Sequence, residues 1–125
     1  MTALSMAERA EDDLLYADKQ LVVRRTSAPD GLSIDGVVDA FNVDAFSRSL
    51  DSSLAGNGDL RIDLNLLEFS DLSGIRALVS AAQRINGGRR LILRGLPEEL
   101  RTVMTVVGWT NLPGLVIAEA RETDK

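Results

Sequence analysis

Short apolar segments with the two-residue period of a β-strand alternate along this chain with longer segments that have the period of an amphipathic helix. In residues 60–64, leucine and isoleucine alternate with polar residues, and the period breaks at residues 66–67, which predicts a strand that leads into a loop. Strands separated by single helices at short spacings are typical of βαβ units, in which successive strands run parallel. The chain is therefore predicted to have an α/β fold.

The predicted order of elements is β-β-α-β-α-β-α-β, with a mixed, mostly parallel sheet and helices packed on it. The first two strands are joined by a turn that contains Pro29 and Gly31. Glycines at residues 56–58, 87–88 and 108 indicate where the three helices end. Strands are expected at 21–26, 32–38, 60–64, 89–95 and 114–120, and helices within 41–58, 72–86 and 96–109.

Composition excludes several classes of protein. The 125 residues are 45% hydrophobic and 26% charged, which is the balance of a soluble globular domain. The chain has no histidine and no cysteine, so it lacks an imidazole base, a thiolate nucleophile and a soft metal site. We therefore expect no enzyme, no metal and no cofactor. The net charge of −5 argues against direct nucleic-acid binding. No apolar run is long enough to span a membrane and no secretory signal is evident, so a cytoplasmic location is expected.

The sequence predicts three parts of the chain: an N-terminal arm or short helix, one domain, and a charged tail. Residues 1–19 have a weak helical pattern among acidic residues and are predicted to form an N-terminal arm or a short helix. Residues 20–118 contain all the predicted strands and long helices, and they are expected to form one domain. Residues 119–125 are a charged C-terminal tail.

Polar residues gather where the helix predicted at residues 72–86 begins. Ser70, Asp71 and Ser73 are all of the residue types that cap helices, and capping alone would explain them. The loop after a strand's carboxyl end is also where open α/β sheets usually place their working residues. Gly74 leaves room for a partner to approach the Ser73 hydroxyl. Because the chain lacks a base for serine chemistry, Ser73 fits an acceptor of modification better than a nucleophile.

Residues 61–117 resemble the STAS domain of anti-sigma factor antagonists, and the similarity extends back to about residue 20. The family has a loop of the form F-x-D-x-S-G before an amphipathic helix, and later a G-W or G-L step. Phe69, Asp71, Ser73 and Gly74 match the loop, and Gly108 with Trp109 matches the step. Leu72 departs from the serine that is frequent at its position, which leaves Ser73 as the hydroxyl at the core of the motif.

The resemblance implies a small switch protein in the regulation of transcription. The unphosphorylated domain would bind an anti-sigma factor with serine kinase activity, and phosphorylation would end that binding. Carried over to this sequence, Ser73 is the expected phosphoacceptor. Asp39, Asn42, Asp71 and Gly74 are the expected partner-binding residues. By itself, Asp39 would more simply be a cap or turn residue before the first helix.

Two alternatives remain at this stage. The domain could be a sensory or scaffold module that is not phosphorylated, with Ser73 only a cap. It could instead bind a small nucleotide through the N–H groups around Ser73 and Gly74, although the glycine spacing matches neither a P-loop nor a dinucleotide fingerprint. The sequence also leaves open whether the chain forms a homodimer.

Overall fold

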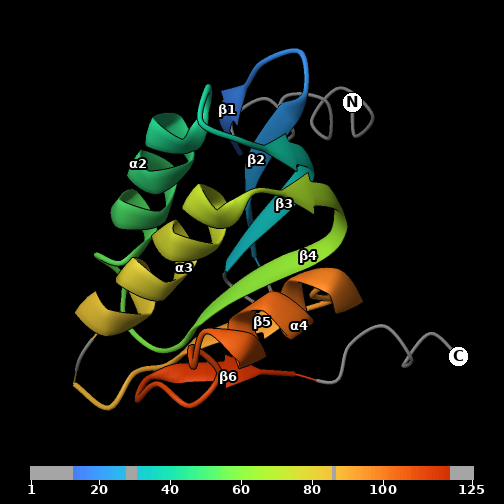
Figure 1. Ribbon diagram of the computed structural model, residues 1–125. Coiled ribbons are helices and arrows are strands. Elements are labelled where there is room, and N and C mark those ends of the chain that lie inside the picture. The colour runs from blue at the N-terminus through green and yellow to red at the C-terminus, as the bar shows by residue number, and fades with distance from the viewer. Residues whose placement is uncertain (1–12, 28–30, 86, 119–125) are drawn as a thin grey trace, which may run out of the picture.

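The computed structural model describes residues 13–27, 31–85 and 87–118, which form a six-stranded sheet with helices packed against it (Figure 1). The strands lie in the sheet in the order in which they occur in the chain. They are β1 (Leu14–Ala17), β2 (Leu21–Thr26), β3 (Gly31–Val38), β4 (Leu60–Ser70), β5 (Leu91–Arg94) and β6 (Leu115–Ile117).

The sheet is mixed. Strands β1, β2 and β3 pair antiparallel, whereas β3, β4, β5 and β6 pair parallel. The change occurs where the chain stops making tight turns and begins to cross over through helices, since parallel neighbours need a long connection. The predicted α/β fold with a mixed, mostly parallel sheet is confirmed.

Strand β1 corrects the prediction that residues 1–19 form an arm or a short helix. Within the described part of that segment, Tyr16 pairs with Val23 and Ala17 with Val22 across an antiparallel ladder. Four residues are too few to show a strand period in the sequence, and the pairing with β2 is what fixes their conformation. Residues 1–12 and the predicted tail at 119–125 lie outside the described residues.

Strand β4 is longer than predicted, because it continues to Ser70 through the segment expected to be a loop. Its register against β3 shifts twice, so that it contributes an extra residue between the pairs Ser33–Asp63 and Asp35–Leu66 and another before Val37–Phe69. Such bulges keep two strands paired while they interrupt the alternation of side chains. This explains why the period in the sequence breaks although the strand does not end.

Three helices within the described residues connect the parallel strands. They are α2 (Val43–Ser53), α3 (Leu72–Arg84) and α4 (Glu98–Val106), each inside its predicted segment. Every crossover joins neighbouring strands in the same direction across the sheet, and right-handed crossovers therefore place all three helices on one face. Figure 1 shows α2 and α3 side by side against the sheet, with their N-terminal ends at the carboxyl edge of the parallel strands.

The hydrophobic core fills the space between the sheet and the helices. Leu60, Ile62 and Leu64 of β4 are buried, whereas the alternate residues on the strand's other face are not. None of the described helices is long and apolar enough to cross a bilayer. The largest fully buried side chains are Phe46, Leu21, Leu32, Ile34, Leu50, Ile62, Leu64, Ile75, Leu91, Leu93, Met104 and Val23.

Candidate functional site

Asp71 caps the N-terminus of α3 and holds Ser73 at the same time. Its Oδ1 accepts hydrogen bonds from the backbone N–H groups of Ser73, at 3.0 Å, and Gly74, at 3.3 Å. The Ser73 hydroxyl donates to the same oxygen at 2.5 Å. The capping role considered from the sequence is thus present and belongs to Asp71. Ser73 is only partly buried, and its hydroxyl is held by the cap.

These hydrogen bonds change the acidity of the cap. The hydrogen bond from the Ser73 hydroxyl is the main cause that holds the pKa of Asp71 below its ordinary value, and the N–H groups of Gly74, Ser73 and Ala40 add to it. Partial burial opposes them without reversing the shift. Asp71 is therefore ionised at neutral pH, and its charge lies at the positive end of the α3 dipole.

Gly74 is required by packing inside the domain. A Cβ at this position would lie 2.1 Å from Ser70 Oγ and 2.8 Å from Val38 Cγ1, both of which are on buried residues. The first turn of α3 thus approaches the ends of β3 and β4 as closely as backbone allows. This corrects the prediction that Gly74 leaves room for a partner, because its missing side chain faces the interior and Gly74 itself is buried.

Asp39 follows the end of β3 and shapes the loop before α2. Its Oδ1 accepts from the N–H of Phe41 at 3.0 Å, and its Oδ2 accepts from the Gln20 side chain at 2.8 Å. Its own N–H donates to Asn42 Oδ1 at 3.0 Å. Phe41 at the tip of this loop is 86% exposed, a feature that the sequence analysis did not single out.

Asn42 is 1% exposed, which corrects the prediction that it lines a partner surface. Its Nδ2 donates to the Val37 carbonyl at 3.0 Å and to Asp18 Oδ2 at 3.3 Å, while its Oδ1 accepts from Asp39. The amide group thus makes hydrogen bonds to three residues, two at the end of β3 and one after β1. Asn42 is therefore a positioning residue that holds the Asp39 loop against the sheet.

Asp18 anchors the other side of this network, and the sequence analysis did not identify it. Its carboxylate accepts from the Tyr16 hydroxyl at 2.6 Å and from the N–H groups of Gln20 and Leu21, each at 2.7 Å. The Tyr16 hydrogen bond is the main cause that lowers the pKa of Asp18. Three of its partners lie within three residues, the spacing of an aspartate turn, whereas its bond with Asn42 joins residues 24 positions apart and gives no local signal.

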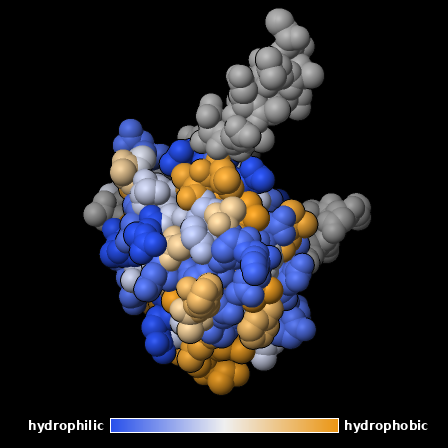
Figure 2. Space-filling view, turned by 90° about the horizontal axis from the view of Figure 1, so that it is seen from above, coloured by the Kyte–Doolittle hydropathy of each residue, from blue (hydrophilic) through white to orange (hydrophobic). Residues whose placement is uncertain are grey.

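The parallel pairing of β3 and β4 brings Asp39 and Ser73 to one edge of the sheet. Val38 and Ser70 are paired, and the N–H of Asp71 donates to the Val38 carbonyl at 3.1 Å. Exposed apolar side chains accompany them: Phe41 on the loop and Leu72, which is 44% exposed, beside Ser73. Figure 2 looks down on this end of the molecule and shows hydrophobic patches between hydrophilic ones. Two large apolar side chains are thus exposed at this edge of the sheet.

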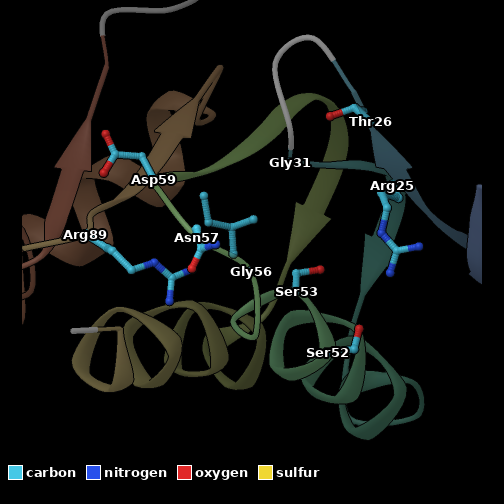
Figure 3. Close-up of a pocket in the computed structure, with 10 residues that line it drawn as sticks. Arg25, Thr26, Gly31, Ser52, Ser53, Gly56, Asn57, Asp59 and Arg89 are labelled. Carbon is cyan, nitrogen blue, oxygen red and sulfur yellow. The ribbon is translucent and has the colours of Figure 1, made fainter. Parts of the chain in front are cut away.

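A concavity lies at the opposite edge of the sheet from Asp39 and Ser73 (Figure 3). Its volume is about 260 Å³, and Arg25 and Arg89 lie on opposite sides of it. The Arg89 guanidinium donates to the carbonyls of Leu54, at 2.9 Å, and Gly58, at 2.8 Å. The Arg89 side chain thus caps the C-terminal end of α2. Among the described residues, no group of acidic side chains is arranged to hold a metal ion.

The fold and the Asp71–Ser73 cap together define a small α/β domain of the STAS type, and comparison with known proteins agrees. The family model described as "Mlab, STAS domain" matches residues 21–117. Because this match covers most of the chain, the protein belongs to the STAS domain family, and the resemblance seen in the sequence is confirmed at that level. No curated protein gives a significant match.

Two solved structures share the fold. One is an anti-sigma factor antagonist from Mycobacterium paratuberculosis, with 19% identity, a TM-score of 0.61, and coverage of 77% of this chain and 83% of that one. The other is the anti-sigma factor antagonist SpoIIAA in its unphosphorylated form, with 16% identity, a TM-score of 0.56, and coverage of 83% and 92%. At these identities the likeness establishes the architecture.

Proposed function

We propose that this protein is an anti-sigma factor antagonist, a binding protein rather than an enzyme. Its partner is an anti-sigma factor with serine kinase activity, and binding releases a sigma factor for transcription in the cytoplasm. The observation that carries the proposal is the position of Ser73, which is only partly buried at the N-terminus of α3 and whose hydroxyl is held by Asp71 at 2.5 Å. The solved antagonists that share the fold support it.

Phosphorylation of Ser73 would change this edge of the sheet in two ways. The Ser73 Oγ forms a bond to the γ-phosphorus of ATP bound to the kinase, ADP leaves, and the hydroxyl proton passes to a base of the kinase. The hydrogen bond from Ser73 to Asp71 is then lost. The phosphoryl group also adds about −1.5 to −2 charges beside an ionised carboxylate. A partner that fits the neutral hydroxyl would be repelled by the charge and by the added bulk.

The second candidate is a STAS binding module that is not phosphorylated. It is favoured by the same hydrogen bond, since the Ser73 hydroxyl already has an internal acceptor, and by the family description, which does not mention sigma factors. The nucleotide-binding alternative has less support. The N–H groups of Ser73 and Gly74 that would receive a phosphate are occupied by the Asp71 carboxylate.

A pull-down with Ser73 variants tests the proposal. Wild type, Ser73→Ala, Ser73→Asp and Ser73→Glu are used as bait for purified candidate anti-sigma kinases, first without ATP and then with it. Ser73→Ala is expected to bind in both conditions, wild type to lose its partner when ATP is added, and the acidic variants to bind weakly in both. Ser80→Glu, on the same helix, is the control for added charge.

Two outcomes of the pull-down would count against this proposal. Equal retention of the kinase by all four baits, with and without ATP, would favour the module that is not phosphorylated. Loss of binding in Ser80→Glu equal to that in Ser73→Glu would show that the effect is a general result of charge on α3.

A further inference from the structure

An apolar groove lies between the end of β4, the first turns of α3, and α4. It measures about 580 Å³. Ile75 and Leu100 form its floor and are almost completely buried, with 2% and 5% of their surface exposed. The apolar side chains that line it are Phe69, Leu72, Ile75, Pro97, Leu100 and Val103.

The walls of the groove expose large apolar side chains to solvent. Phe69 is 54% exposed, Leu72 is 44% exposed and Val103 is 37% exposed. The three come from different elements, β4, α3 and α4, so the fold itself assembles them on one surface. A contiguous apolar surface built over a hydrophobic floor is typical of a site that another molecule covers.

The charged residues of the groove indicate the sign of the charge that a bound molecule should carry. Glu68 and Glu99 line it, and no lysine or arginine does. The chain's own first twelve residues carry Glu8, Glu11 and Asp12 against Arg9 alone, so their charge has the same sign as the groove. A second copy of this chain, with a net charge of −5, is repelled in the same way. The complementary occupant is basic.

The shape points to a helix. The groove is bounded on one side by α3 and on the other by α4, and its apolar residues lie on both walls and on the floor. Grooves of this kind receive one face of an amphipathic helix, whose apolar residues recur at steps of three and four. A helix of about 14 residues, roughly 21 Å long, presents three to four turns of such a face.

We propose that this groove docks an amphipathic helix of a partner protein, with apolar residues facing Ile75 and Leu100 and with lysine or arginine residues along its flanks facing Glu68 and Glu99. The inference rests on the groove alone and does not require that Ser73 be phosphorylated. Because Leu72 adjoins Ser73, a helix in the groove would extend the contact surface at this edge of the sheet.

Selection from a phage-displayed library of helix-forming peptides, with one face and both flanks randomised, tests the proposal. The full chain is the target, and enriched peptides are measured by fluorescence anisotropy. We expect them to share an apolar stripe with basic flanks. Leu72→Glu and Val103→Glu should each weaken binding at least about tenfold, equivalent to about 1.4 kcal/mol. Glu68→Gln combined with Glu99→Gln should weaken it less.

Matched controls separate the possible outcomes. Val106→Glu adds the same charge on α4 at a residue that is 79% exposed and does not line the groove, so it should leave binding unchanged. Circular dichroism confirms that each variant is folded. Absence of enrichment, an acidic consensus, or binding that ignores Leu72→Glu and Val103→Glu would overturn the proposal.

Light scattering of the chain alone tests whether a second copy of the chain occupies the groove. A dimer that Val103→Glu dissociates would overturn the proposal in favour of a second copy, whereas a monomer supports it. The selection uses neither ATP nor a kinase. Failure of the peptide selection would therefore leave the proposed phosphorylation switch standing. Failure of the pull-down with Ser73 variants would likewise leave the proposed helix groove standing.

Discussion

Replacing Asp71 with alanine removes the group on which the geometry around Ser73 depends. The substitution deletes the acceptor of two backbone hydrogen bonds, at 3.0 and 3.3 Å, and of the Ser73 hydroxyl at 2.5 Å. Loss of an aspartate N-cap costs about 0.5–2 kcal/mol. Because this cap is ionised and also accepts from the Ser73 hydroxyl, we expect the upper part of that range, about 1–2 kcal/mol.

The pH dependence of the effect has a definite sign. The folded-state pKa of Asp71 lies below that of the unfolded chain, so its contribution to stability is complete above the unfolded pKa of about 4. The contribution is lost as the pH falls through the folded-state pKa. The difference in unfolding free energy between wild type and Asp71→Ala should therefore be largest at neutral pH and shrink in acid.

Urea unfolding followed by circular dichroism measures this difference at pH 7 and in steps down to about pH 3, bracketing the carboxyl range. Asp35→Ala is the control, since Asp35 is an exposed aspartate of β3 and should change stability by less than about 0.5 kcal/mol. Asp71→Asn keeps an oxygen acceptor and should lose less than Asp71→Ala. A cost below about 0.5 kcal/mol for Asp71→Ala at pH 7, or a cost that grows in acid, would refute the reasoning.

Three further predictions follow from individual contacts, all measured by the same urea unfolding. Asn42→Ala should cost about 1–3 kcal/mol, because it leaves the Val37 carbonyl and the Asp39 N–H without their partner, and a cost near zero would contradict the positioning role. Gly74→Val should cost about 1–3 kcal/mol by overpacking against Ser70 and Val38, and Ser70→Ala in the same chain should recover part of it; no recovery would contradict the close approach. Arg89→Ala should cost about 0.5–1.5 kcal/mol through the carbonyls of Leu54 and Gly58, whereas Arg94→Ala, on an exposed residue, should be neutral; equal costs would contradict the role of Arg89.

Local periodicity was sufficient to predict most of the fold. Helix α3 was expected at residues 72–86 and is found at Leu72–Arg84, because its apolar stripe is regular; the helix ends at Ile85, whose backbone is extended, before the two glycines are reached. The parallel pairing of the later strands was also predicted, since strands that alternate with single helices are typical of βαβ units. The helices depend on interactions among residues close together in the chain, and their order along the chain favours parallel strands.

Features that depend on distant parts of the chain were missed. The length of β4 is set by bulges against β3, and the conformation of β1 is set by its pairing with β2. Asn42 donates a hydrogen bond to Asp18, which is 24 residues earlier. The sequence indicated that Ser73 and Asp71 form a polar cluster at a helix start, but it could not show that Gly74 faces the interior. The apolar groove likewise exists only because α4 packs near the start of α3.

The claim that Ser73 is the phosphoacceptor is tested most directly by mapping the site of modification. The chain is incubated with ATP and the anti-sigma kinase recovered on Ser73→Ala, and the products are analysed by mass spectrometry with fragmentation. We predict one phosphoryl group, located on Ser73, and none on the Ser73→Ala chain. An unmodified product, or a phosphoryl group on another serine or threonine, would contradict the account.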